Sequence, residues 1–394
     1  MKVLQVSPVA FAPDGIIGGA ERYALELARA MASLTETRLV TFGRPRVEQA
    51  GPLSVRAYRP WAYVGRKRLG PLAPALIWEM ARADVVHCHQ AHTFLADLCV
   101  LLGRLLRKPV FLTDHAGGDR HFNRRLGTIE HATGLLLVSE HNAAGFAPHR
   151  GKIRVIYGGA DTERFAPRPL PRQRSALYVG RLIPYKGVHH LIEGVRADTE
   201  VRLAGAPYHA EYERFLRQVA KGRNVRFLGP VLGDALVDEY CSAGVCVLPS
   251  VEVDRYGKRY PKGEILGLVL LEAMACQTPV VCSNIGGMPE LVADGETGLI
   301  VPAGDSARLG EAVEQVLDDP ALARRLGQAG RERVLARFTW RAVAERCLAA
   351  YGELGRLDVD PAGHRAPRRG RRGASLVLAS PRLGRDGTQG GAGR

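Results

Sequence analysis

Hydrophobic and polar positions follow two alternating periods along most of the chain. Short runs rich in Val, Leu and Ile, such as "KVLQVS", "TRLVTFG" and "ADVVHCH", are separated by longer stretches with an apolar residue every three or four positions, such as "AERYALELARAMA". The short runs predict β-strands and the longer stretches predict amphipathic helices. Because strands that alternate with helices form parallel sheets, we expect α/β, doubly wound domains.

The alternation is interrupted by a polar segment rich in proline and arginine, "DTERFAPRPLPRQRS", which begins at Asp161. Such a segment predicts a linker, and a chain of 394 residues exceeds the usual size of one domain. After about Asp358 the sequence is Gly- and Arg-rich without a regular period, which predicts disorder. We therefore expect two Rossmann-like domains at 1–165 and 166–340, a helix at 341–357 that packs back toward the N-terminal domain, and a disordered basic tail at 358–394.

Composition narrows the class of protein. The chain is 46% hydrophobic and 24% charged, as soluble globular proteins are, and its apolar runs stop short of the roughly 18 residues that a membrane span requires. The N-terminal "MKVLQVSPVAFAP" has one basic residue and predicts a first strand rather than a secretory signal. The seven cysteines form no CxxC pair, which is typical of a reducing compartment. We therefore expect a cytoplasmic protein.

The net charge of +15 is concentrated in the N-terminal half and in the tail. Two basic segments, "RKRLG" at 66–70 and "GRLLRKP" at 103–109, place cations beside leucine and proline, as an amphipathic surface for anionic lipid does. We expect peripheral association with the inner face of an anionic membrane. Basic faces that are merely solvated are the alternative.

A glycine pair precedes the first predicted helix. Gly18 and Gly19 leave room for backbone N–H groups to approach an anion, and the helix dipole favours negative charge there. The stretch does not match the GxGxxG dinucleotide fingerprint. A phosphate-binding loop and a plain tight turn both fit this pattern.

Two cations follow the first strand of the second half. In "LYVGRLIPYKG", Arg181 and Lys186 lie five residues apart between a strand and a helix. Arginine as a fork and lysine as a point charge suit a diphosphate. Two solvated surface cations are the alternative.

Two glutamates, Glu264 and Glu272, stand in the otherwise apolar stretch "KGEILGLVLLEAMACQTPVV". We expect "LVLLEAMAC" to form a buried helix, in which a charged carboxylate needs a polar partner, and a vicinal diol such as that of ribose suits Glu272. Glu264 precedes the helix and is expected to face sugar hydroxyls, with amides around Gly267 free to donate. The alternative is that Glu264 is an ordinary first-turn acid and that Glu272 pairs with an arginine.

Histidines follow two of the predicted strands, at His87, His89 and His115. No HExxH or DxD pattern accompanies them, so a metal site is not expected, and for each of them a hydrogen-bonded structural role is the default. Ser139 and His141 do not form a nucleophile motif such as GxSxG.

Placed in order, these stretches resemble the family-4 retaining glycosyltransferases of the GT-B fold, over about residues 1–354. The residues that carry the resemblance include "GGAERYALELARAMA", "DVVHCHQ", "VIYGGADTERFAP", "VGRLIPYKG" and "EILGLVLLEAMACQTPVVCSNIGGMPELVADGETGLIVPAGD". The family's fold is two Rossmann-like domains that face each other across a cleft.

The resemblance implies roles for positions that match the family's nucleotide site. Arg181 and Lys186 match the pair that binds the donor diphosphate. Gly19 matches the loop whose amide approaches the phosphate from the other domain. Glu272 matches the acid that binds the ribose, and Phe227–Leu228 matches the region along the base.

The resemblance also implies a sugar site and the absence of a metal requirement. Glu264 matches the acid near the donor-sugar hydroxyls and the reacting face, and His115 matches a strand-end histidine near the sugar 6-hydroxyl and the anomeric carbon. In the family, fixed cations and helix amides stabilise the leaving diphosphate, so no metal and no cofactor are expected. The implied catalytic residues are His115 and Glu264, and the implied donor-binding residues are Gly18, Gly19, Arg181, Lys186, Phe227, Leu228, Leu266, Gly267, Leu268 and Glu272.

Some positions depart from the family's pattern. Ile265 and Leu266 stand where Gly or Pro and then Phe are common, which affects the expected shape of the sugar pocket. The sequence 157–159 is Tyr-Gly-Gly where Pro-Asn-Gly is usual, and Ala116 replaces a frequent Asp after the histidine. The loop "VEVDRYGKRYPKGE" is longer and more charged than usual and is expected to reach toward the acceptor.

The resulting expectation is a metal-independent hexosyltransferase. It would move a hexose with retention from a nucleotide-diphosphate sugar to a saccharide or lipid-linked saccharide acceptor, as in the synthesis of a cell-surface polysaccharide or glycolipid. The alternatives are a non-catalytic nucleotide-sugar-binding protein, a nucleotide-sugar 2-epimerase and, less favoured, nucleic-acid binding through the Arg-rich tail.

Overall fold

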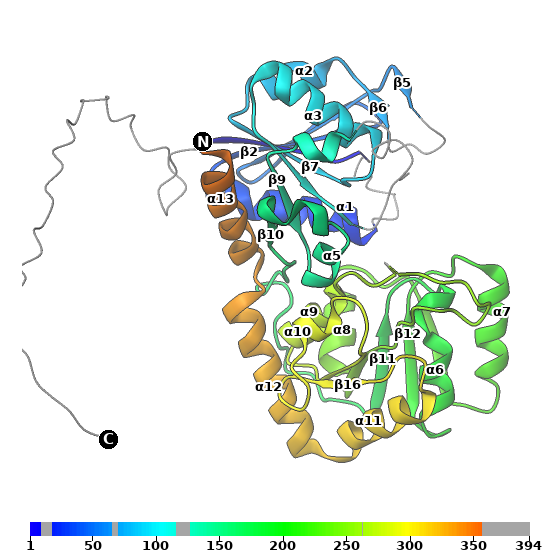
Figure 1. The fold of residues 1–394 in the computed structure, drawn as a ribbon. Coiled ribbons are helices and arrows are strands. Elements are labelled where there is room, and N and C mark those ends of the chain that lie inside the picture. Colours follow the sequence, from blue (N-terminus) through cyan, green and yellow to red (C-terminus); the bar gives the residue numbers. More distant parts are fainter. Residues whose placement is uncertain (9–17, 65–69, 116–126, 262, 357–394) are drawn as a thin grey trace, which may run out of the picture.

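Two α/β domains face each other in the computed structural model, which describes residues 1–8, 18–64, 70–115, 127–261 and 263–356 (Figure 1). This architecture confirms the predicted GT-B arrangement of two Rossmann-like, doubly wound domains. The predicted tail at 358–394 and most of the basic segment 66–70 lie outside the described residues.

The N-terminal domain is built on an eight-stranded sheet in the order β10-β9-β8-β7-β1-β2-β4-β3. Its strands are β1 (Lys2–Val6), β2 (Glu36–Phe42), β3 (Arg46–Ala50), β4 (Leu53–Tyr58), β7 (Val85–His89), β8 (Val110–Thr113), β9 (Gly134–Leu137) and β10 (Ile153–Val155), with a separate hairpin of β5 (Ala62–Tyr63) and β6 (Pro71–Leu72). Its helices are α1 (Gly19–Ala32), α2 (Ala75–Ala81), α3 (Phe94–Leu106) and α5 (Glu140–Ala144), with short 3₁₀ turns at Thr128–His131 and Ala147–Lys152.

Successive residues of this sheet face two different helix layers, as the two-residue period of a strand requires. Val3 packs in one core with residues of α1 and of the C-terminal helix, while Leu4 packs in another core with residues of α2 and α3. Strand order reverses between β1 and β7, and in open α/β sheets ligands bind at such a reversal, beyond the carboxyl ends of the strands.

The C-terminal domain repeats this plan on a six-stranded parallel sheet in the order β13-β12-β11-β14-β15-β16. Its strands are β11 (Ser175–Val179), β12 (Glu200–Ala204), β13 (Val225–Gly229), β14 (Val245–Leu248), β15 (Val280–Ser283) and β16 (Leu299–Val301). Its helices are α6 (Val188–Gly194), α7 (Ala210–Val219), α8 (Gly233–Ser242), α9 (Leu268–Ala275), α10 (Met288–Leu291), α11 (Ser306–Asp318) and α12 (Pro320–Arg337), with a 3₁₀ turn at Pro184–Lys186. The order reverses between β11 and β14.

The chain ends its described part with α13 (Trp340–Gly355), which crosses back and packs beside α1 (Figure 1). Asp319 caps α12 by accepting from the N–H groups of Ala321 and Leu322, at 2.9 and 3.0 Å, and Thr339 caps α13 in the same way. These caps divide the predicted helical end into three helices. The Tyr351 hydroxyl lies 2.7 Å from Nδ1 of His87, deep in the N-terminal domain.

Two features differ from the sequence prediction or add to it. Strand β3 runs antiparallel to β4, although the alternating pattern predicted parallel strands throughout. Val47 in β3 is exposed, so the strand carries little hydrophobic signal. Within the described residues, no helix is both long enough and apolar enough to span a bilayer.

Candidate functional site

The carboxyl ends of the two sheets meet across the cleft through residues that begin α5. The Ser139 hydroxyl donates to the carbonyl oxygen of Ile265 at 2.6 Å. The Glu290 carboxylate accepts from the backbone N–H groups of Glu140 and His141, at 2.7 and 2.9 Å. An acid at the start of a helix is favoured by the helix dipole, so Glu290 of one domain stabilises a helix of the other.

Glu264 lies in the loop that leads from β14 to α9, with a cation beside it. Its carboxylate forms an ion pair with the ammonium of Lys186 and accepts from the Ser250 hydroxyl at 3.0 Å. A side chain at Gly286 would collide with the Glu264 carbonyl oxygen, so glycine is needed there for the close approach. Since α9 begins at Leu268, Glu264 is not a first-turn acid.

Helix α9 begins in the cleft without a side-chain cap. Gly267 precedes it with φ of 96°, in the left-handed region that favours glycine. The first N–H groups of a helix have no partner within the helix, so those of α9 can donate to an anion. Leu266 is buried and Leu268 is half-buried.

Glu272 lies one turn into α9 and has two partners. Oε1 forms an ion pair at 2.8 Å with Arg22 of α1, and Oε2 accepts from the Tyr240 hydroxyl at 2.9 Å. Burial raises the pKa of the Glu272 carboxyl, and the Arg22 guanidinium opposes that rise. The arginine pairing that the sequence left open for Glu272 is therefore present, and the arginine comes from the other domain.

The remaining predicted phosphate and base positions belong to the C-terminal domain, after β11 and in the outer strand β13. Arg181 is exposed after β11, with its guanidinium 5.4 Å from the centre of the Tyr208 ring. Phe227, with Leu228 beside it in β13, lies under the guanidinium of Arg217 at 4.5 Å. Phe227 and Leu228 are half-buried at the edge of the sheet.

Across the cleft, Gly18 and Gly19 begin α1 as predicted. A side chain at Gly18 would touch the carboxylate of Glu21, because that carboxylate lies against the start of the helix. Glycine at position 18 therefore leaves room for this carboxylate.

His115 ends a relay of buried polar side chains. His89 places Nε2 at 3.0 Å from Oε1 of Gln5 and Nδ1 at 3.2 Å from Nε2 of His115. Because an amide oxygen only accepts, His89 carries its proton on Nε2, and His115 donates through Nε2 and keeps Nδ1 as an acceptor. Burial lowers the pKa of His115 to about 4 and that of His87 to about 3, so both are neutral at pH 7.

Two of the departures from the family's pattern touch each other. A Cβ at Gly158 would lie 2.7 Å from Cδ2 of Leu266 and 2.7 Å from Cδ2 of Leu268. Tyr157 adopts φ of 61°, and its carbonyl oxygen accepts from the Tyr23 hydroxyl. Glycine at 158 therefore accommodates leucine at 266 in the contact between the domains.

The long loop after β14 folds into a small hairpin that reaches the N-terminal domain. Asp254 accepts from the N–H groups of Tyr256 and Lys258, at 2.9 and 3.0 Å, which closes the turn. Arg255 lies over the Phe215 ring of α7, and the carbonyl oxygen of Pro261 is 3.4 Å from Nε2 of His141. Its contact with an acceptor stays a prediction.

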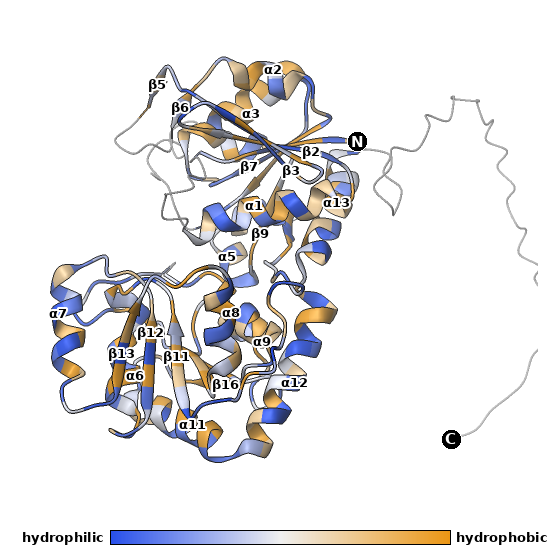
Figure 2. Ribbon diagram, turned by 180° about the vertical axis from the view of Figure 1, so that it is seen from behind, coloured by the Kyte–Doolittle hydropathy of each residue, from blue (hydrophilic) through white to orange (hydrophobic). Residues whose placement is uncertain are grey.

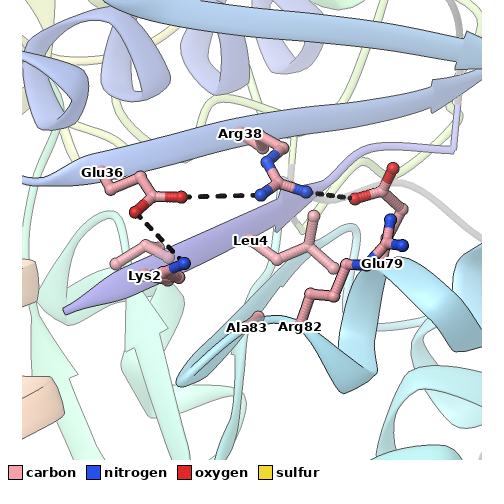
Figure 3. Close-up of a pocket in the computed structure, with 8 residues that line it drawn as sticks. Lys2, Leu4, Glu36, Arg38, Glu79, Arg82 and Ala83 are labelled. Atoms are coloured by element: carbon pink, nitrogen blue, oxygen red, sulfur yellow. Dashed lines mark hydrogen bonds and ion pairs between the residues drawn. The ribbon is translucent and has the colours of Figure 1, made fainter.

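A shallow hollow at the opposite end of the N-terminal sheet is not part of this site. Figure 3 shows Lys2, Glu36, Arg38 and Glu79 joined there by ion pairs, of which Arg38–Glu79 measures 2.8 Å. In the part of the chain that the structure describes, no three His, Cys, Asp or Glu side chains converge as metal ligands would. Whether the protein needs a metal stays a prediction.

Arg22, Tyr240, Ser250 and Glu290 were not singled out from the sequence. Arg22 offered one signal, because a cation in the first turn of a helix opposes the helix dipole and calls for a separate explanation. Tyr240, Ser250 and Glu290 gave no signal, because the partners that a side chain meets in the folded chain have no fixed sequence spacing.

Comparison with known proteins agrees with this geometry. The model for Glycosyltransferase Family 4 matches residues 17–164, and that for Glycosyl transferases group 1 matches residues 160–333. Alpha-maltose-1-phosphate synthase of Mycobacterium tuberculosis is 32% identical over 398 residues, which cover 87% of this chain and 97% of the relative. D-inositol 3-phosphate glycosyltransferase of Geodermatophilus obscurus is 29% identical and covers 88% of this chain and 87% of the relative.

Among solved structures, sucrose-phosphate synthase of Thermosynechococcus elongatus superposes with a TM-score of 0.72 and 26% identity, over 90% of this chain and 100% of that one. Anabaena HepE, solved in complex with UDP, has the same fold, with a TM-score of 0.69 and 19% identity over 90% of this chain and 100% of that one. The chain therefore belongs to the glycosyl transferases of group 1 and is a glycosyltransferase with the GT-B fold.

Proposed function

We propose that the protein transfers a hexose, with retention, from a nucleotide-diphosphate sugar to a saccharide or lipid-linked saccharide acceptor. The observation that carries the proposal is the arrangement along one edge of the C-terminal sheet. Lys186 and Glu264 lie together, the uncapped start of α9 follows, and Glu272 lies one turn further on. This order matches that of sugar, diphosphate and ribose in a nucleotide sugar.

Each part of the donor then meets a suitable group. Arg181 and Lys186 provide positive charge for the diphosphate, and the first amides of α9 add donors at fixed positions. As the bond from the sugar C1 to the diphosphate oxygen breaks, negative charge grows on that oxygen. Fixed cations and amides stabilise this charge without reorganisation, which lowers the barrier.

Glu264 and His115 act on the sugar in this proposal. Glu264 accepts from sugar hydroxyls while Lys186 and Ser250 hold its carboxylate in place. His115 accepts a hydrogen bond from a sugar hydroxyl through Nδ1, since its Nε2 is engaged with His89. The N-terminal domain binds the acceptor, and closure of the cleft excludes water from the reacting carbon.

Donor binding is tested by thermal unfolding with UDP-, GDP- and ADP-sugars. A ligand at 100 times its dissociation constant stabilises the protein by about 2.7 kcal/mol. We expect one donor to raise the melting temperature, and Arg181→Ala and Glu272→Ala each to remove that rise. An unchanged rise in both variants would refute the site. The matched control is Arg226→Ala. Arg226 is an exposed arginine of β13 that pairs with Glu200 of β12.

Turnover separates the alternatives. A transferase releases nucleotide diphosphate only when an acceptor is present, an epimerase isomerises the donor without acceptor, and a binding protein does neither. The acceptor screen should include sugar phosphates, because the names of three similar proteins contain a phosphate.

Treatment with EDTA tests whether the transferase needs a metal. Activity that survives EDTA supports metal independence, and loss that Mg²⁺ or Mn²⁺ restores contradicts it.

We also propose that a lipid-linked acceptor is met at an anionic membrane through the outer faces of α2 and α3. Figures 1 and 2 show α2 and α3 on the side of the N-terminal domain that lies away from the C-terminal domain. Ile77 and Trp78 of α2 and Leu101 and Leu105 of α3 are exposed. Within 70–115, a fully described range, the exposed charged side chains of these helices and their ends are all arginines: Arg82, Arg104 and Arg107. Exposed Trp and Leu beside arginine suit an anionic lipid surface.

Vesicle co-sedimentation tests this contact. We expect the protein to bind vesicles with anionic lipid more strongly than neutral vesicles at low salt, and Trp78→Ser with Leu105→Ser to weaken that binding. Leu335→Ser, which changes an exposed leucine on α12, serves as the control. Equal binding to both kinds of vesicle would refute the contact.

A further inference from the structure

The ion pair between Arg22 and Glu272 joins the two domains at the predicted ribose site. Nη1 of Arg22 lies 2.8 Å from Oε1 of Glu272, and the two side chains are 30% and 4% exposed. Arg22 lies in the first turn of α1, and its guanidinium also lies 5.4 Å from the centre of the Phe165 ring. Since a cation in the first turn opposes the helix dipole, its position is better explained by Glu272 than by α1 itself.

The contacts of Glu272 leave each of its two oxygens able to accept one more hydrogen bond, as a vicinal diol requires. A carboxylate has about four acceptor positions, two on each oxygen. Arg22 occupies one position on Oε1 and Tyr240 occupies one on Oε2. One position therefore remains on each oxygen, and a vicinal diol presents two hydroxyl groups to fill them.

The groups around Glu272 influence the charge of its carboxyl. The groups that face it are Arg22 and Glu26 from α1, Tyr240 from α8, Arg164 from the segment before β11, and the thiols of Cys246 on β14 and Cys276 at the end of α9. Burial raises the pKa of Glu272, and Arg22 is the strongest group that lowers it. A protonated carboxyl has fewer acceptor positions, so it binds a diol less well.

We propose that Arg22 is a positioning residue for the nucleotide ribose, supplied by the N-terminal domain, which orients the Glu272 carboxylate toward the 2′ and 3′ hydroxyls when the cleft is closed. Recognition of the ribose then depends on closure, because the donor domain alone lacks the cation. This inference rests on the proposed function, since it requires that the site binds a ribonucleotide.

The experiment measures nucleotide affinity by calorimetry between pH 5.5 and 8.5. UDP, GDP and ADP are screened with the wild type, and the tightest of them is compared with its 2′-deoxy form. The variants are Arg22→Met, which keeps the length of the side chain and removes the charge, Arg22→Lys and Glu272→Gln. The control is Arg29→Met, because Arg29 is an exposed arginine of α1 paired with Glu26.

We expect Arg22→Met to weaken binding about tenfold relative to the wild type, as loss of a bond to a charged group does, at every pH of the series, with the larger ratio at pH 5.5. At pH 5.5 the variant should also lose the preference for the ribo over the 2′-deoxy form. A merely structural loss would weaken both forms equally at every pH. Arg29→Met should match the wild type.

Three outcomes decide the inference. If the wild type binds none of the three nucleotides, the proposed function fails and the inference fails with it. If Glu272→Gln loses the ribo preference while Arg22→Met matches the wild type at every pH, the inference alone is overturned. Tighter binding by Arg22→Met would also overturn it, because Arg22 would then compete with the ribose. If Arg22→Met does not fold, Arg22→Lys is measured in its place. The inference then requires a weaker preference for the ribo over the 2′-deoxy form than the wild type shows, and an unchanged preference overturns it.

Discussion

The two glutamates of the proposed donor site are eight residues apart in sequence, and their partners come from different parts of the molecule. Glu264 is held by Lys186 and Ser250, which belong to its own domain. Glu272 is held in part by Arg22, which belongs to the other domain. The two groups that hold Glu264 thus come from the C-terminal domain alone, whereas Glu272 gains its cation only when the two domains are in contact.

The largest effect on turnover is expected for Lys186, which pairs with Glu264 of the same domain. Lys186→Ala removes the cation beside both Glu264 and the proposed diphosphate, so turnover should fall by about 100-fold or more. Steady-state kinetics with the matching donor measures this fall. Lys221→Ala, a change to an exposed cation after α7, should leave turnover within about twofold of the wild type. Unchanged turnover in Lys186→Ala would contradict the proposed role.

The next largest effect, on donor affinity, is expected for Glu272, which pairs with Arg22 of the other domain. Glu272→Ala should weaken donor binding by about 10- to 100-fold and lower the free energy of unfolding by about 1–3 kcal/mol, because a half-buried guanidinium loses its partner. Calorimetry and urea unfolding measure the two effects. Glu272→Gln keeps the shape and separates loss of charge from loss of packing. Full donor affinity in both variants would remove Glu272 from the site.

Asp97 of α3 extends the comparison to a buried carboxylate that no cation contacts within the part of the chain that the structure describes. It accepts from the Thr128 hydroxyl, its other oxygen has no hydrogen-bond partner among the described residues, and burial raises its pKa to about 6. A raised pKa gives stability that is present below about pH 4 and is lost as the pH rises through 6. Asp97→Asn should therefore be about 2 kcal/mol more stable than the wild type at pH 8, with a smaller difference at pH 5. Urea unfolding at both pH values tests this, and a larger difference at pH 5 would contradict it.

The smallest effect is expected at the contact that closes the cleft without touching the donor. Glu290→Gln keeps one of the two hydrogen bonds to the start of α5, because an amide has a single acceptor oxygen, and removes the charge that favours them, at a cost of about 1–2 kcal/mol. The donor KM should rise about two- to fivefold while kcat changes little, and Glu296→Gln, at an exposed acid, should change neither. A change in kcat alone would place Glu290 in the chemistry instead.

Local patterns predicted the parts of the fold and site that depend on local residues. The two-residue and three-to-four-residue periods identified most strands and helices of both sheets, although β4 was not predicted. The apolar stretch around Glu272 predicted α9 and its need for a polar partner. The exposed strand β3 carried too few apolar residues to be found. The identity of the partner, Arg22, depends on how the domains face each other, which no period encodes.

The departures at Gly158 and Leu266 illustrate the same limit. Each changes the family's pattern at a position distant in sequence, and only their contact shows that the small residue accommodates the large one. The sequence therefore showed which positions of the expected sugar pocket depart from the family, and the structure shows that two of them pack against each other between the domains.

The double crossing of the chain has a mechanical consequence. One crossing runs through Ala160 and the other through Phe338 and Thr339, and the N–H of Ala160 donates to the carbonyl oxygen of Phe338 at 2.8 Å. A body tethered at a single point can swivel and twist, whereas two adjacent tethers bonded to each other leave mainly rotation about the line between them. The cleft is therefore expected to open as a door does, so that Arg22 returns to Glu272 along the same arc in every cycle.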